Sequence, residues 1–154
     1  MSEKRVLFLC TGNSARSQMA EALVNHLLGN RWVAFSAGVE PTSHVHPLAV
    51  QAMAEIGIDI SAQHPKPVDV FRGQSFDAVI TLCDHAAETC PLWLGGGVRA
   101  HIALPDPAAA TGNDAERLAV FRRVRDDIRE RVIAALAQIE AIQGERGSYG
   151  AREF

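Results

Sequence analysis

A cysteine and an arginine that stand six positions apart are the residues of this sequence best placed to do chemistry together. Cys10 follows a short apolar run, and Arg16 closes a stretch of turn-forming residues where a helical pattern begins. A loop of this kind points successive backbone N–H groups inward, where they and the helix dipole bind a tetrahedral oxyanion. The guanidinium of Arg16 adds two coplanar donors that match two oxygens of such an anion. The predicted oxyanion-binding loop comprises Thr11, Gly12, Asn13, Ser14, Ala15 and Arg16.

Cys10 is the expected nucleophile of this loop. The inward N–H groups stabilise a thiolate, so we expect the pKa of Cys10 to be depressed. Ser17 is positioned in the sequence to donate its hydroxyl hydrogen to the sulfur, and Gly12 permits unusual backbone angles. The alternative is a buried cysteine beside a surface arginine. The coincidence of strand, glycine turn, arginine and helix start favours the reactive loop.

Hydrophobic patterns predict the elements that must position this loop. Short apolar runs predict strands at residues 6–9, 32–35, 76–82 and 99–103. Apolar residues at helical spacing predict helices at residues 16–28, 47–56 and 113–143. Alternation of strands and helices predicts an α/β fold with a parallel sheet covered on both faces. Cys10 then lies at the carboxyl edge of the sheet, where such folds bind ligands.

Composition narrows the classes of protein. The chain has 154 residues, 47% of them hydrophobic, which predicts one domain over residues 1–143, followed by a mobile tail at 144–154. The net charge of −3 argues against a nucleic-acid partner, and no apolar run is long enough to cross a membrane. The apolar run at 6–10 is too short for a signal-peptide core. Three widely spaced cysteines suit a reducing compartment, so we expect a cytoplasmic protein.

Three sequence motifs resemble those of one known family. Residues 6–21, which read VLFLCTGNSARSQMAE, are similar to the signature of low-molecular-weight tyrosine phosphatases and thioredoxin-coupled arsenate reductases. The Ser-Ala-Gly at 36–38 and the Asp-Pro at 106–107 resemble the family's next two landmarks, and the resemblance covers about residues 4–143. It implies a three-layer α/β/α fold with a four-stranded parallel sheet. It also implies that Asp106 is the general acid, although an Asp-Pro pair by itself is more often an ordinary turn.

Cys83 and Cys90 separate the two activities of that family. They follow the third predicted strand, and their segment resembles the one that carries two extra cysteines in the reductases. The resemblance implies that Cys83 attacks a Cys10–arsenate adduct, that Cys90 then attacks Cys83, and that thioredoxin reduces the final disulfide. Seven residues of helix would span about 10.5 Å, whereas a disulfide tolerates Cα separations of about 4.4–6.8 Å. A helix between them must therefore unwind before the disulfide can form. Gly95, Gly96 and Gly97 would give the backbone the flexibility that this change requires.

Arsenate reduction is thus the expected activity, with arsenate as substrate and phosphate or sulfate as analogues. Ala108 follows Asp106-Pro107 where phosphatases of the family often carry a tyrosine, which favours a small inorganic substrate. A tyrosine phosphatase with silent Cys83 and Cys90 is the alternative enzyme, and a redox-regulated anion sensor is the non-enzymatic one. If the two cysteines take no part in catalysis, Cys83 is a buried residue at the end of a strand and Cys90 has no particular role.

No bound cofactor or metal is expected. The histidines and cysteines lack the spacing of a zinc site. Asn13, Glu21 and Ser36 match positions that line a potassium site in some reductases of the family, and Lys66 falls where a further acidic residue would stand. The Lys66 ammonium either replaces the ion or is an ordinary surface lysine.

Overall fold

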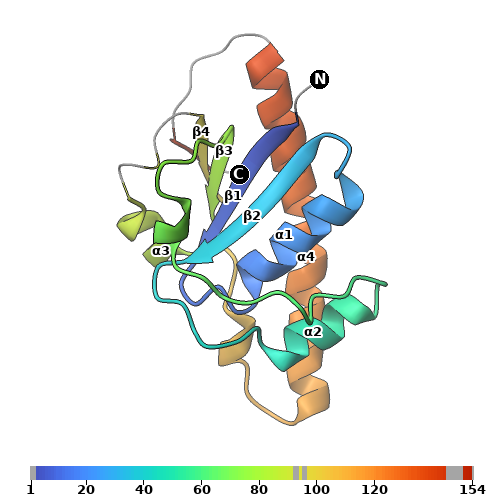
Figure 1. Ribbon diagram of the computed structural model, residues 1–154. Coiled ribbons are helices and arrows are strands. Elements are labelled where there is room, and N and C mark those ends of the chain that lie inside the picture. Colours follow the sequence, from blue (N-terminus) through green and yellow to red (C-terminus); the bar gives the residue numbers. More distant parts are fainter. Residues whose placement is uncertain (1–2, 92–93, 95–96, 145–150, 154) are drawn as a thin grey trace.

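The computed structural model describes residues 3–91, 94, 97–144 and 151–153 as one α/β unit (Figure 1). The elements in chain order are β1 (Lys4–Cys10), α1 (Arg16–Leu27), β2 (Trp32–Gly38), α2 (Pro47–Ala54), the 3-10 helix η1 (Val68–Phe71), β3 (Ala78–Thr81), α3 (Asp84–Thr89), β4 (Val98–His101), the 3-10 helix η2 (Pro107–Ala109), α4 (Asp114–Gly144) and β5 (Ala151–Glu153).

The sheet has the strand order β2-β1-β3-β4-β5, and all neighbouring strands are parallel. Strands β1 to β4 form the expected four-stranded parallel sheet, so the predicted fold class is confirmed. The three-residue strand β5 pairs with the outer edge of β4 and was not predicted. Residues 145–150 and 154 of the predicted tail lie outside the described residues, and the mobility of the tail stays a prediction.

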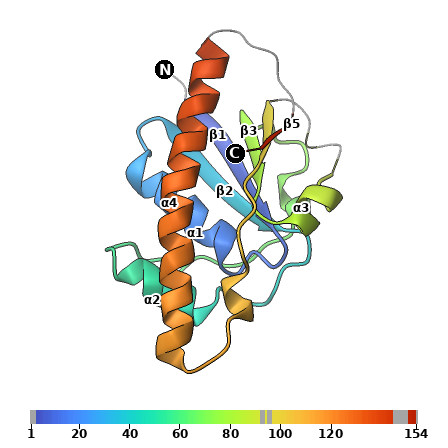
Figure 2. The same cartoon turned by 180° about the vertical axis from the view of Figure 1, so that it is seen from behind.

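The two faces of the sheet are covered by different elements (Figures 1 and 2). Trp32 of β2 donates from Nε1 to Glu140 of α4 at 3.0 Å, which places α4 on one face, and α1 packs beside it. Phe35, from the other face of β2, meets the rings of Phe71 and Phe76 edge-on, with centroids 5.7 and 5.8 Å away. The segment that carries η1 therefore covers the second face, as a parallel sheet requires.

The long helix α4 matches its predicted position because its apolar stripe is fully engaged in the core. The buried residues of that stripe are Leu118, Phe121, Val124, Ile128, Val132, Leu136 and Ile139. The helix also contacts the residue just after α2. Its Arg122 and Arg125 lie 2.6 and 3.1 Å from the Glu55 carboxylate. Among the described residues, no helix is both long and apolar enough to pass through a membrane.

Candidate active site

The loop between β1 and α1 turns its carbonyl groups away from the cavity that it encloses. Four of its carbonyl oxygens accept hydrogen bonds of 2.8–3.1 Å from backbone N–H groups of the segment after β2, in the pairs Val39–Cys10, Glu40–Thr11, Thr42–Gly12 and His46–Ser14. Within the described residues, the N–H groups of Gly12, Ser14, Ala15 and Arg16 meet no acceptor. These donors have no acceptor within the protein, and oxyanion binding by this loop stays a prediction.

Asn13 carries the unusual backbone angle of the loop. Its φ is 52°, in the left-handed region, whereas Gly12 has no positive φ. The unusual backbone angle predicted for Gly12 therefore lies at Asn13 instead. Gly12 is needed instead for space, because a Cβ there would lie 3.0 Å from the Thr42 Cγ2 methyl group. The turn at Asn13 directs its own N–H to the Cys10 sulfur at 3.2 Å.

A chain of hydrogen bonds fixes the direction of the Ser17 hydroxyl. The Asn13 amide donates from Nδ2 to Ser17 Oγ at 2.7 Å and to Ser36 Oγ at 3.0 Å. Ser36 in turn donates to the Glu21 carboxylate at 2.7 Å. Ser17 Oγ lies 2.8 Å from Cys10 Sγ, and since a thiolate has no hydrogen, Ser17 is the donor when the sulfur is charged. The chain thus supports the charged form of Cys10.

The pKa of Cys10 nevertheless differs from the expectation. Burial of the sulfur, which leaves the residue 2% exposed, raises the pKa of Cys10 and outweighs the opposing effects. Hydrogen bonds from Ser17 and Asn13 and the charge of Arg16 lower the pKa, but to a smaller extent. The predicted depression of the pKa is therefore wrong for the free enzyme. The sequence showed the donors but not how deeply the sulfur is buried.

A cavity of about 340 Å³ opens above the loop, and Cys10, Arg16 and Asp106 line it together. Arg16 is anchored by a 3.2 Å hydrogen bond from Nη1 to the Leu104 carbonyl, which holds its guanidinium against the cavity. Asp106 lies on the wall, and its Oδ1 accepts the Ala108 N–H at 3.0 Å, which shapes the turn at η2. The lining residues are Cys10, Thr11, Gly12, Ser14, Ala15, Arg16, Glu40, Thr42, Asp106 and Ala108.

The second cysteine of the predicted relay lies beside this loop. Cys83 Sγ is 3.2 Å from Thr11 Oγ1, and Leu82 next to it donates its backbone N–H to the Leu9 carbonyl at 2.8 Å. Cys10 therefore ends β1, and Cys83 lies just beyond the end of the neighbouring strand β3. Cys83 also caps α3, since its sulfur accepts the Ala86 N–H at 3.4 Å.

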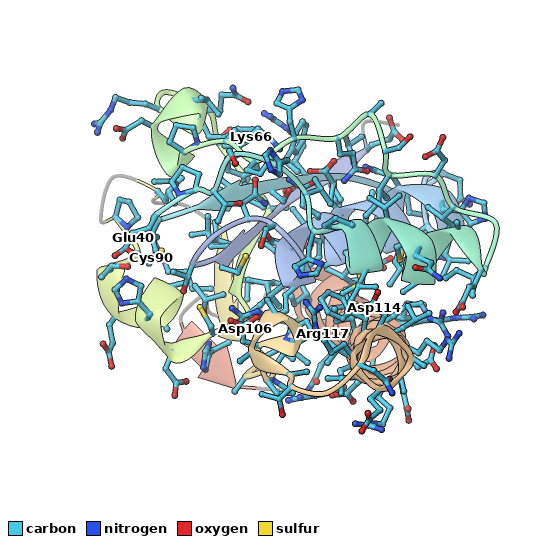
Figure 3. All side chains as sticks on the ribbon, turned by 90° about the horizontal axis from the view of Figure 1, so that it is seen from below. Glu40, Lys66, Cys90, Asp106, Asp114 and Arg117 are labelled. Carbon is cyan, nitrogen blue, oxygen red and sulfur yellow. The ribbon has the colours of Figure 1, made fainter. Side chains whose placement is uncertain are left out.

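Cys90 is the C-cap residue of α3, at the end opposite to Cys83. Figure 3 labels Cys90 near this helix. All three cysteines are free thiols in this structure. The segment between Cys83 and Cys90 is helical, so the prediction that it must unwind for their disulfide to form still applies. Gly95 and Gly96, which were expected to give slack, lie outside the described residues. Gly97 has a φ of 74°, and a Cβ at this position would clash with the carbonyl oxygens of Phe76 and Asp77.

Lys66 and Glu21 face each other beneath the loop. Lys66 Nζ lies 3.7 Å from the Glu21 carboxylate, so a positive charge is already present there. The NH₂ group of Asn13 donates to Ser36 Oγ. Its Oδ1 accepts hydrogen bonds from the Gln18 side chain and from the Lys66 backbone N–H. The Lys66 ammonium therefore supplies the positive charge beside Glu21, and its replacement of a potassium ion stays a prediction. Elsewhere in the described chain, no three His, Cys, Asp or Glu side chains gather to hold a metal.

Sequence reasoning missed several residues of the site. Glu40 and Thr42 line the cavity, and Glu40 also meets His85 of α3 at 3.1 Å. Arg99 of β4 contacts the sulfur of Cys90. These contacts join segments far apart in the chain, so the spacing of residues within one segment could not predict them.

Comparison with known proteins agrees with this geometry. The family described as "Low molecular weight phosphotyrosine protein phosphatase" matches residues 5–145. The chain is 51% identical to an arsenate reductase of Halalkalibacterium halodurans over 132 residues, 86% of this chain and 94% of that protein. An arsenate reductase solved in the phosphate binding state superposes with a TM-score of 0.75 at 38% identity, over 88% of this chain and 98% of its own. A thioredoxin-dependent arsenate reductase of Corynebacterium glutamicum superposes with a TM-score of 0.68 at 30% identity, over 90% of this chain and 63% of its own.

Proposed function

The chain belongs to the low molecular weight phosphotyrosine protein phosphatase family, and we propose that it is an arsenate reductase that uses Cys10, Cys83 and Cys90 as a thiol relay. The observation that carries the proposal is the placement of the three thiols. Cys10 lies at the base of an oxyanion loop, Cys83 follows the neighbouring strand β3, and Cys83 and Cys90 flank the two ends of α3. Hydrolysis of a phosphate ester needs only the first of them.

Arsenate binding begins with the loop and Arg16. The inward N–H groups and the guanidinium hold three oxygens of the anion, and phosphate and sulfate fit the same donors. Burial raises the pKa of Cys10, which favours the thiol over the thiolate before the anion binds. A bound arsenate dianion brings an oxygen that accepts this proton, and Ser17 then donates its hydrogen to the thiolate.

Cys10 then forms the adduct. Its sulfur attacks arsenic, an S–As bond forms, and the As–O bond opposite it breaks. Asp106, on the cavity wall, protonates the departing oxygen so that it leaves as water. The arsenic remains in its oxidised state at this stage.

Cys83 performs the reduction. Its sulfur attacks Cys10 Sγ, the S–S bond forms, and the electron pair of the S–As bond leaves with arsenic as arsenite. Cys90 next attacks Cys83, which releases the Cys10 thiol and leaves a Cys83–Cys90 disulfide. An external dithiol then reduces that disulfide and becomes oxidised itself. Thioredoxin is the proposed donor because a thioredoxin-dependent relative has the same fold. This donor and the free thiols are consistent with a cytoplasmic enzyme.

Serine variants of the relay cysteines test this proposal against a phosphatase with silent cysteines. Cys90→Ser should release one equivalent of arsenite and then stall with a Cys10–Cys83 disulfide. Cys83→Ser should stall earlier with the arsenic still on Cys10. Single-turnover arsenite release and peptide mapping of the disulfides measure both. Aryl phosphate hydrolysis, which needs neither residue, is the control for intact loop geometry. Full arsenate turnover by both variants at the parent rate would refute the relay.

A further inference from the structure

One face of β4 holds both ends of the helix that joins the relay cysteines. His101 Nε2 lies 3.0 Å from Asp84 Oδ1 in the first turn of α3. Arg99 donates from Nη1 to Cys90 Sγ at 2.8 Å at the other end. Residues two apart on a strand share a face, so both side chains reach α3 from the same side of the sheet. The folded sheet therefore defines where Cys90 lies.

Arg99 makes further contacts that fix the chain just beyond Cys90. Its Nη2 donates to the Pro91 carbonyl at 3.3 Å and also to the Leu94 carbonyl. A guanidinium has five N–H donors in a rigid plane, and here the donors meet a sulfur and two carbonyls of one short segment. Arg99 brings a full positive charge to a half-buried sulfur, where such a contact stabilises negative charge more than it does at an open surface.

We propose that Arg99 is a further residue of the relay, which holds the Cys90 sulfur in the reduced enzyme and shifts the Cys83–Cys90 pair toward the dithiol. This inference rests on the relay proposed above. When Cys90 attacks, the Cys90–Cys83 bond forms, the Cys10–Cys83 bond breaks, and the electron pair leaves on the Cys10 sulfur, which takes up a proton. Arg99 stabilises the Cys90 thiolate before this attack, and the negative charge then passes to the leaving Cys10 sulfur.

The same contact must be lost in the oxidised enzyme. A helix places the Cα atoms of Cys83 and Cys90 about 10.5 Å apart, and the disulfide needs about 4.4–6.8 Å, so Cys90 has to move away from Arg99. Arg99 therefore stabilises the dithiol and not the disulfide. As a result, an external dithiol should reduce the Cys83–Cys90 disulfide more readily than it would without Arg99.

The redox equilibrium of the pair tests this role without arsenate. Cys10→Ser leaves Cys83 and Cys90 as the two remaining thiols, and their oxidised fraction is measured by alkylation after equilibration with mixtures of reduced and oxidised dithiothreitol. Adding Arg99→Met should raise the equilibrium constant for oxidation roughly tenfold, the effect of losing one charge-assisted hydrogen bond. Arg99→Lys, which keeps the charge, should fall between the two. Arg31→Met, which removes an exposed arginine paired with Glu140, is the matched control and should leave the equilibrium unchanged.

The outcomes separate this inference from the proposed function. An Arg99→Met equilibrium equal to the parent's, or shifted toward the dithiol, would overturn the role of Arg99 while leaving the relay intact. So would an Arg99→Lys value equal to that of Arg99→Met, because loss of packing alone would then explain the shift. If Cys83 and Cys90 form no disulfide at any dithiothreitol ratio, both the relay and the role of Arg99 fail. Arsenite production by the unmodified enzyme is judged independently.

Discussion

Ser17→Ala removes the hydroxyl that donates to the nucleophile and leaves the rest of the loop in place. Ser17 Oγ lies 2.8 Å from Cys10 Sγ, and the Asn13 amide that now bonds to Ser17 retains Ser36 as an acceptor. A hydrogen bond to a charged group contributes about 1.5–3 kcal/mol, so attack by Cys10 should slow roughly 10- to 100-fold near neutral pH. The pKa of Cys10, already raised by burial, should rise further because Ser17 lowers it.

Alkylation of Cys10 by iodoacetamide measures this effect directly. With Cys83→Ser and Cys90→Ser in the background, Cys10 is the only thiol, and its alkylation rate can be followed from about pH 6 to about pH 10. The variant should lag behind the parent at neutral pH and approach it as the pH rises, because a fully ionised sulfur reacts in both. Ser43→Ala, on an exposed loop, is the matched control. Equal rates at neutral pH, or a lag that does not narrow at high pH, would refute stabilisation of the thiolate by Ser17.

Three further changes test other parts of the structure. Asp106→Asn should slow turnover roughly 10²- to 10³-fold with little change in phosphate inhibition, whereas a change in KM alone would make Asp106 a turn residue. Gly38→Ala should lower both activity and melting temperature, because the new Cβ would lie 2.7 Å from the Thr11 carbonyl; parent-like melting would contradict this contact. Glu55, whose pKa falls to about 2 beside Arg122, stabilises the fold above about pH 4.5 and progressively less as the pH falls toward 2. Glu55→Gln should therefore lose less stability than the parent between neutral pH and pH 3 in thermal unfolding, and an equal loss in both would contradict the pairing.

The sequence predicted the elements that carry regular hydrophobic patterns. The stripe from Leu118 to Ile139 defined α4 to within a residue at each end, and the apolar run before Cys10 defined β1 because it is buried on both faces. The 3-10 helices were missed since they are short and follow local turn geometry. The strand β5 was missed because three residues show no usable period.

The candidate site was predicted where its residues are close in the chain. Cys10, Arg16 and Ser17 follow from one loop, and Asp106 and Cys83 were placed through family resemblance and prove to lie beside that loop. Local spacing could not show that burial raises the pKa of Cys10, because burial depends on the whole core.

The residues that were missed act across the sheet. Glu40 reaches the cavity from the segment after β2, and Arg99 reaches Cys90 from β4. Neither belongs to a motif with a recognisable spacing. Both became visible only when the strands were paired and their side chains assigned to a face.

Arsenate-dependent oxidation of NADPH tests the central claim most directly. The enzyme is mixed with thioredoxin, thioredoxin reductase and NADPH, and the absorbance of NADPH is followed after arsenate is added. The account predicts steady oxidation by the parent enzyme and less than about one per cent of that rate for Cys10→Ser, since removal of a covalent nucleophile costs several orders of magnitude. A parent enzyme that hydrolyses an aryl phosphate but oxidises no NADPH with arsenate, or a Cys10→Ser variant that still oxidises it, would contradict the account.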